Sequence, residues 1–169
     1  MSRDSAIKSS LGPQLVFLIL VLAGCGEDYE GSVVRPFEAT EIAAIPDTLH
    51  SDANHLIIES SVNRDFQPIC PEDGRPMTGS IRLKDINEVP LGLSVSEATL
   101  YVISSNKMWV RDLVVRGPYD TRPHQLEMYA SEGPKWEPGL VVDIVVLFRD
   151  EKGEQFRIKE ENVKISESS

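Results

Sequence analysis

Histidine and cysteine, the side chains that most often perform acid–base and nucleophilic chemistry, are scarce in this chain. The sequence contains His50, His55 and His124, together with Cys25 and Cys70. No serine occupies a Gly-x-Ser-x-Gly sequence, the pattern that places a hydrolase nucleophile on a sharp turn. Cys70 lies among prolines, without a helix N-terminus that could activate its thiol. These residues predict a protein that is not an enzyme.

Metal binding is a second chemistry that the sequence could support. His50 and His55 are close together, and Cys70 with Met77, Met108 and Met128 would supply soft ligands for copper(I). However, the chain has no Met-x-x-Met or His-x-His sequence, and Met128 falls in the apolar register of a predicted strand. The glycines are dispersed and form no phosphate-binding loop. We therefore expect no resident metal and no cofactor.

Aromatic side chains are the remaining candidates for a ligand-binding site. The candidates are Trp109, Trp136, Tyr119 and Tyr129. An exposed aromatic ring can stack on a sugar ring or anchor a protein partner, because it combines a large apolar face with a polar tip. For the two tryptophans, packing in the core or at its edge is the alternative.

The charge of the chain limits its partners. Seventeen Lys and Arg residues stand against 27 Asp and Glu residues, which gives a formal net charge of -10. Nucleic acids require clusters of cationic side chains, so we expect no nucleic-acid partner. Anionic lipid headgroups would also repel this chain.

The N-terminal residues have the parts of a secretory signal. Arg3 and Lys8 precede an apolar run at 15–22, which is shorter than the about 20 residues that span a bilayer. Leu22-Ala23-Gly24-Cys25 resembles the lipobox of bacterial lipoproteins. The resemblance implies cleavage before Cys25, a diacylglycerol on its thiol and a membrane anchor. The residue after Cys25 is Gly26 rather than aspartate. By the same resemblance, we expect the protein to lie in the bacterial cell envelope, at the outer membrane.

Composition divides the chain into three parts. Residues 1–24 are the predicted signal peptide, 25–52 an acylated N-terminus with an acidic tether, and 53–166 a β-sandwich domain. Within the tether, 38–45 could form two helical turns, although isolated helices this short are marginal. With Cys25 acylated, Cys70 has no partner for an intramolecular disulfide.

Alternating apolar residues and turn signals predict about seven strands. The expected strands are 56–62, 80–84, 98–103, 108–115, 124–130, 140–149 and 154–159, with Val163 and Ile165 extending the last one or following a bulge. Both faces of 140–149 are largely apolar, which indicates a central strand. Glu137-Pro138-Gly139-Leu140 suits a type II turn before it.

The run Trp136-x-Pro138-Gly139-x-x-Val142-x-Ile144-x-Val146 resembles the corner and penultimate strand of fibronectin type III and related immunoglobulin-like domains. It implies an all-β, immunoglobulin-like β-sandwich of about seven antiparallel strands. The sequences 79–81, 90–91 and 98–102 also fit a transthyretin-like sandwich. The overall expectation is a lipid-anchored, non-catalytic binding or scaffolding module with an envelope protein as partner. The alternative is a small-ligand binder for carbohydrate or copper.

Overall fold

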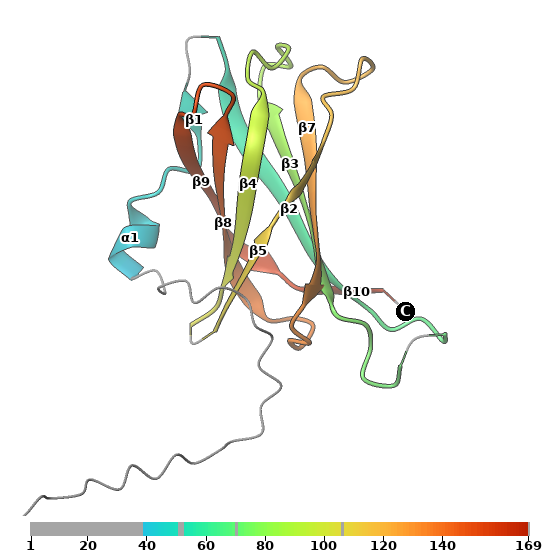
Figure 1. Ribbon diagram of the computed structural model, residues 1–169. Coiled ribbons are helices and arrows are strands. Elements are labelled where there is room, and N and C mark those ends of the chain that lie inside the picture. Colours follow the sequence, from blue (N-terminus) through green and yellow to red (C-terminus); the bar gives the residue numbers. More distant parts are fainter. Residues whose placement is uncertain (1–38, 51–52, 70, 106, 169) are drawn as a thin grey trace, which may run out of the picture. The chain divides into compact units, whose positions relative to one another are not determined.

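The computed structural model describes residues 39–50, 53–69, 71–105 and 107–168 (Figure 1). The predicted signal peptide, the lipobox-like sequence with Cys25, the first part of the predicted tether and Cys70 lie outside the described residues. Within the described ranges, no helix is both long and apolar enough to cross a membrane.

The described chain is built almost entirely of strands in two sheets that face each other (Figure 1). The elements are α1 Ala39–Ala43, β1 Leu49–His50, β2 His55–Asp65, β3 Met77–Asp85, β4 Val95–Ile103, β5 Met108–Asp112, β6 Val114–Arg116, β7 Gln125–Gly133, β8 Val141–Asp150, β9 Gln155–Lys164 and β10 Ser166–Ser168. We call the sheet with order β1-β2-β3-β7-β6 the first sheet; β10 also pairs with β2, in parallel. The second sheet has the order β5-β4-β8-β9.

This strand order is that of an immunoglobulin-like sandwich. The main path of the first sheet, β2-β3-β7-β6, corresponds to strands A, B, E and D of that fold, and β9-β8-β4-β5 corresponds to G, F, C and C′. The structure therefore confirms the predicted all-β fold class. It also decides between the immunoglobulin-like and transthyretin-like topologies in favour of the first.

The core lies between the sheets and is centred on β8. Val142, Ile144, Val146 and Phe148 are each at most 1% exposed on its inner face. Val145, on the opposite face, is also fully buried, and β8 pairs with β4 on one side and β9 on the other. The prediction that 140–149 forms a central strand is confirmed. Its preceding turn is also as predicted: Gly139 has φ of 88°, and the Leu140 N–H donates to the Glu137 carbonyl at 3.3 Å.

The predicted strand at 108–115 is wrong in one respect, because the chain changes sheet within it. β5 pairs with β4 in the second sheet, whereas β6 pairs with β7 in the first. Between them, the Leu113 N–H donates to the Ala98 carbonyl at 2.8 Å. Trp109 and Leu113 stay buried on both sides of this crossing while Arg111 is exposed. Because buried Trp109 and Leu113 are separated by an even number of positions, the sequence pattern resembles one uninterrupted strand, although Arg111 between them is exposed.

Residues 39–50, which the sequence assigns to the tether, pack on the sandwich; we call this segment the strap. Ile42 and Ile45 are buried against Val145 on the outer face of the second sheet, where Tyr101 and Ile103 also contact them. The Lys159 N–H donates to the Pro46 carbonyl at 3.0 Å, and β1 pairs with the start of β2. The packed chain therefore begins before residue 53. Contact with the sheet stabilises a helical turn that would be marginal alone.

Candidate binding face

The outer face of the first sheet carries mostly polar side chains and is hollowed by a groove of about 800 Å³. We call this surface the polar face. It is lined by Ser61, Asn63, Thr78, Gly79, Ser80, Arg111, Asp112, Val114, Arg116, Tyr129, Ala130 and Ser131. The residues come from β2, β3, β5, β6 and β7, so the arrangement depends on the whole sheet and on the crossing between β5 and β6.

Strand register aligns four of these residues in a row. Ser61 is paired with Ser80, Ser80 with Tyr129, and Tyr129 with Val114. Neighbouring strands lie about 4.8 Å apart, so the row extends for about 14 Å across the sheet. The polar side chains are short, which leaves the face open beside the one large ring, Tyr129.

Tyr129 is fixed by contacts on both its hydroxyl and its ring. The hydroxyl donates to Glu127 Oε2 at 2.8 Å, and the Arg116 guanidinium lies 5.1 Å from the ring centroid. The hydrogen bond to Glu127, followed by burial, raises the pKa of Tyr129 above its usual value. The phenol therefore stays neutral at physiological pH, and its ring presents a preorganised contact, because two neighbours restrict its rotation.

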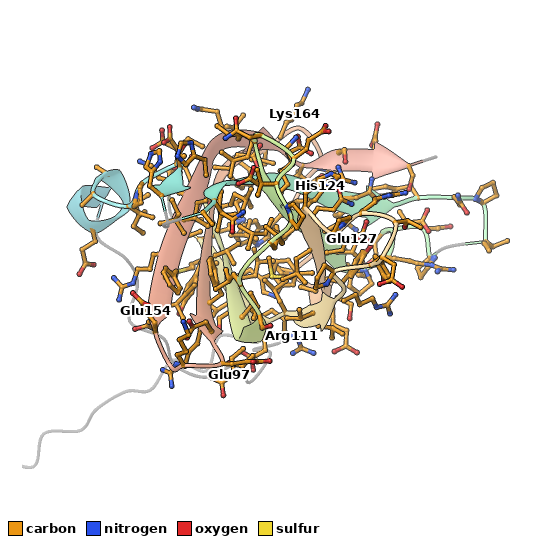
Figure 2. All side chains as sticks on the ribbon, turned by 90° about the horizontal axis from the view of Figure 1, so that it is seen from above. Glu97, Arg111, His124, Glu127, Glu154 and Lys164 are labelled. Carbon is orange, nitrogen blue, oxygen red and sulfur yellow. The ribbon has the colours of Figure 1, made fainter. Side chains whose placement is uncertain are left out.

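The three charged residues that line the groove carry a net positive charge, whereas the whole chain is acidic. Arg111 is exposed and donates to Glu132 Oε2 at 2.6 Å, whereas Arg116 has its cation–π contact with Tyr129. Among the described residues, no carboxylate lies within ion-pair distance of Arg116. Figure 2 marks Arg111 and Glu127 among the side chains of the sandwich. An acidic chain thus presents two arginines and one aspartate along the groove.

The structure separates the four aromatic candidates into two pairs. Trp109 and Trp136 are 7% and 8% exposed and belong to the core, which was the alternative reading for both. A Cβ added to Gly133 would lie 2.9 Å from Trp109 Cζ2, so the indole fills its space closely. Tyr119, in the loop between β6 and β7, is 46% exposed. Tyr129 lines the groove, Tyr119 does not, and neither tryptophan is offered to solvent.

The soft ligand set proposed for copper(I) is not assembled in the described parts of the chain. Met77 and Met128 are fully buried in the core, and Cys70 lies outside the described residues. Across the same parts, His, Cys, Asp and Glu side chains form no group of three or more that could hold a metal ion.

Two of the buried polar side chains, Arg64 and Asp85, hold loops in place. Arg64 is 3% exposed; its guanidinium donates to the carbonyls of Asp73, Arg75, Lys135 and Trp136 and lies 4.7 Å from the Phe66 ring centroid. It therefore joins the loop after β2 to the segment before β8. The alternation of β2 places residue 64 inward, but nothing in the sequence identifies its carbonyl partners.

Asp85 is the second buried polar group. Its carboxylate accepts from the backbone N–H groups of His55, Asn87 and Val89 and from the Asn54 amide, at 2.7–3.2 Å. Burial would raise the pKa of Asp85, but these hydrogen bonds outweigh burial and lower it. These hydrogen bonds hold the end of β3 against the start of β2, so the role of Asp85 is structural.

Comparisons with known proteins add little to this geometry. No family model matches the sequence, and no curated protein matches it significantly. Among solved structures, the fold search finds a DUF4466 family protein from Parabacteroides merdae with 17% identity and a TM-score of 0.28. The match covers 64% of this chain and 44% of the other. The chain thus spans less than half of that protein's length.

Proposed function

We propose that this protein is a lipid-anchored, non-catalytic module of the bacterial cell envelope, whose polar face binds a protein partner. The supporting observation is the composition of that face, where serine, threonine, asparagine and glycine surround a fixed tyrosine and two arginines. Serine, glycine, asparagine and tyrosine are enriched in antibody binding sites, and tyrosine and arginine dominate interface hot spots.

The two outer faces of the sandwich also favour this choice of surface. The outer face of the second sheet carries Val145, Tyr101 and Ile103, which the strap covers. The outer face of the first sheet has no such cover among the described residues, because the strap reaches that sheet only at its edge, where β1 pairs with β2. The uncovered face is therefore the one whose polar side chains can form hydrogen bonds with a partner at a hydrated interface.

The anchor is supported by the sequence Leu22-Ala23-Gly24-Cys25. An acylated Cys25 would be joined to the first described residue, Ala39, by a segment that reaches at most about 50 Å when fully extended. Two or three acyl chains hold a protein stably on a membrane without help from surface charge. The net charge of -10 is compatible with such an anchor, since lipid rather than cationic residues provides the attachment.

A carbohydrate ligand is the second candidate. It is favoured by the serine and threonine hydroxyls that line the groove beside the Tyr129 ring. Against it, the Tyr129 ring is already in contact with Arg116, so a sugar would have to displace the guanidinium. A protein partner can use both side chains without displacing either.

Site-specific crosslinking tests the proposed face. A photoreactive amino acid at Ser80, in the middle of the row, should capture a partner in membranes of the source bacterium. The same group at Arg157, an exposed position on β9 of the other sheet, should not. With the captured protein purified, Tyr129→Ala and Arg116→Ala should each weaken binding about 30-fold, which corresponds to a hot-spot loss of about 2 kcal/mol. Equal capture from both positions, or unchanged affinity in both variants, would refute the proposed face.

The anchor is tested by Cys25→Ser. We expect the variant to lose lipid attachment and to leave the detergent phase, in which the wild-type protein partitions. A variant that remains in the detergent phase would show that the lipobox interpretation is wrong.

A further inference from the structure

Two histidines meet where the strap joins the first sheet. β1 and β2 place His50 and His55 directly opposite each other, and their ring centroids are 4.6 Å apart. The rings are nearly perpendicular, at 80°. Both residues are exposed, so each imidazole can turn about its χ2 bond without disturbing the core.

This spacing suits a shared metal ion. Imidazole nitrogen binds Zn²⁺ at about 2.0–2.1 Å, which places two coordinating nitrogens about 3 Å apart. The two rings already touch edge to face, and the proposed site requires that rotation of the exposed side chains bring one nitrogen of each ring to that separation. Imidazole is a preferred ligand of Zn²⁺, Cu²⁺ and Ni²⁺, which tolerate water at their remaining positions. The net charge of -10 also attracts divalent cations.

The neighbouring contacts keep this pair in position. The backbone N–H of His55 donates to Asp85 Oδ2 at 2.7 Å, and the backbone carbonyl of His55 accepts from the Ile86 N–H at 2.9 Å. On the other strand, Leu49 packs against the core beside His50. The backbone of both histidines is therefore ordered by groups that a metal ion would not touch.

We propose that His50 and His55 form a two-histidine site for a divalent transition metal ion, which clasps the strap to the sandwich. β1 is only two residues long, and its pairs are Leu49 with Leu56 and His50 with His55. A metal ion bound to both imidazoles adds a second link at the end of this short ladder. Since the ion binds the closed strap more tightly than the open one, it shifts the strap toward the closed state.

Titration of the full-length protein with Ni²⁺ alone tests the site. We expect one ion per chain, and a loss of affinity of at least about tenfold in His50→Gln and in His55→Gln, because even groups that only support a metal ligand contribute tenfold or more. His124→Gln is the matched control and should bind like the wild type. Glutamine approximates the size of histidine at the exposed positions 50 and 55 and at the half-buried position 124, and circular dichroism of each variant checks that it folds.

Hydrogen exchange tests the clasp. Saturating Ni²⁺ should slow exchange in residues 39–50 of the wild type, and a chelator should reverse the effect. Neither histidine variant should show this protection. The proposal is overturned if both variants bind Ni²⁺ as tightly as the wild type, if His124→Gln loses as much affinity as they do, or if Ni²⁺ binds without protecting the strap.

Discussion

Replacing Ile45 by alanine isolates the contribution of the strap to stability. Ile45 is 6% exposed and, with Ile42, covers the fully buried Val145 on the outer side of the second sheet. The substitution removes three carbon atoms from this contact. At about 0.8 kcal/mol per buried methylene, the lost transfer free energy is about 2.4 kcal/mol.

Little should be added to this value by a cavity. The strap lies on the outside of the sandwich and can settle toward Val145, whereas a site between two sheets collapses poorly and costs more. For a domain of this size, a loss of about 2.4 kcal/mol lowers the thermal midpoint by about 8 °C. Ile69→Ala is the matched control, because Ile69 is 81% exposed and its substitution should change stability by less than about 0.5 kcal/mol.

Two measurements together make the test specific. Thermal unfolding followed by circular dichroism reports the midpoint, and hydrogen exchange with mass spectrometry reports opening of residues 39–50. We expect Ile45→Ala to lower the midpoint and to accelerate exchange in the strap, while Ile69→Ala does neither. If both variants behave alike in both measurements, Ile45 does not hold the strap, and residues 39–50 are the spacer that their composition predicts.

Three further predictions concern the core, its acid sensitivity and the turn before β8. Phe148→Ala should destabilise the protein by about 3–5 kcal/mol in denaturant unfolding, because Phe148 is fully buried, whereas Arg157→Ala should change stability little. Burial alone would raise the pKa of Asp85, but its hydrogen bonds lower it in the folded state. The carboxylate therefore stabilises the fold fully above its unfolded pKa of about 3.9. This contribution is lost as the pH falls through the lower pKa of the folded state. Stability of Asp85→Asn should therefore fall less steeply below pH about 4, and an unchanged acid profile would contradict this role. Gly139→Val should lower the thermal midpoint, because φ of 88° disfavours a β-branched residue; an unchanged midpoint would show that the turn adapts.

The longer strands could be predicted from the sequence because each one alternates toward a single core. On β8, Val142, Ile144, Val146 and Phe148 alternate along one face, and all four are buried. The crossing after β5 could not be predicted, because Trp109 and Leu113 both remain buried although the chain passes from one sheet to the other between them. Period-two alternation records which side of a strand faces the core, but not which sheet the strand belongs to.

The strap was missed for a different reason. Its five-residue helix would be unstable alone. The composition of the segment resembles that of a linker, so its isoleucines were not interpreted as core residues. The information was in another strand: Val145, on the second apolar face of β8, requires a cover. Sequence analysis detected the second apolar face of this strand but interpreted it only as the mark of a central strand, and it did not identify the covering segment, which is about 100 positions away in the chain.

The polar face shows the same limit for the candidate site. The aromatic residues were selected by type, and burial then separated the two tryptophans from the two tyrosines. Ser61, Ser80 and Arg116 were not selected, since single serines and arginines are common on any surface. Only strand register brings them into one groove beside Tyr129.

The positions of the strap and the polar face together bear on how an anchored protein could bind a partner. The strap lies on the outer side of the second sheet, so the chain that would lead from Cys25 joins the domain there. The polar face is on the outer side of the first sheet, with the core between them. A force on the anchor would therefore act on α1 and the contacts of Ile42 and Ile45 before it reached the groove. A metal ion held by His50 and His55 would strengthen the far end of the same segment. If the proposed anchor and partner are both present, the attachment and the polar face lie on opposite sides of the core.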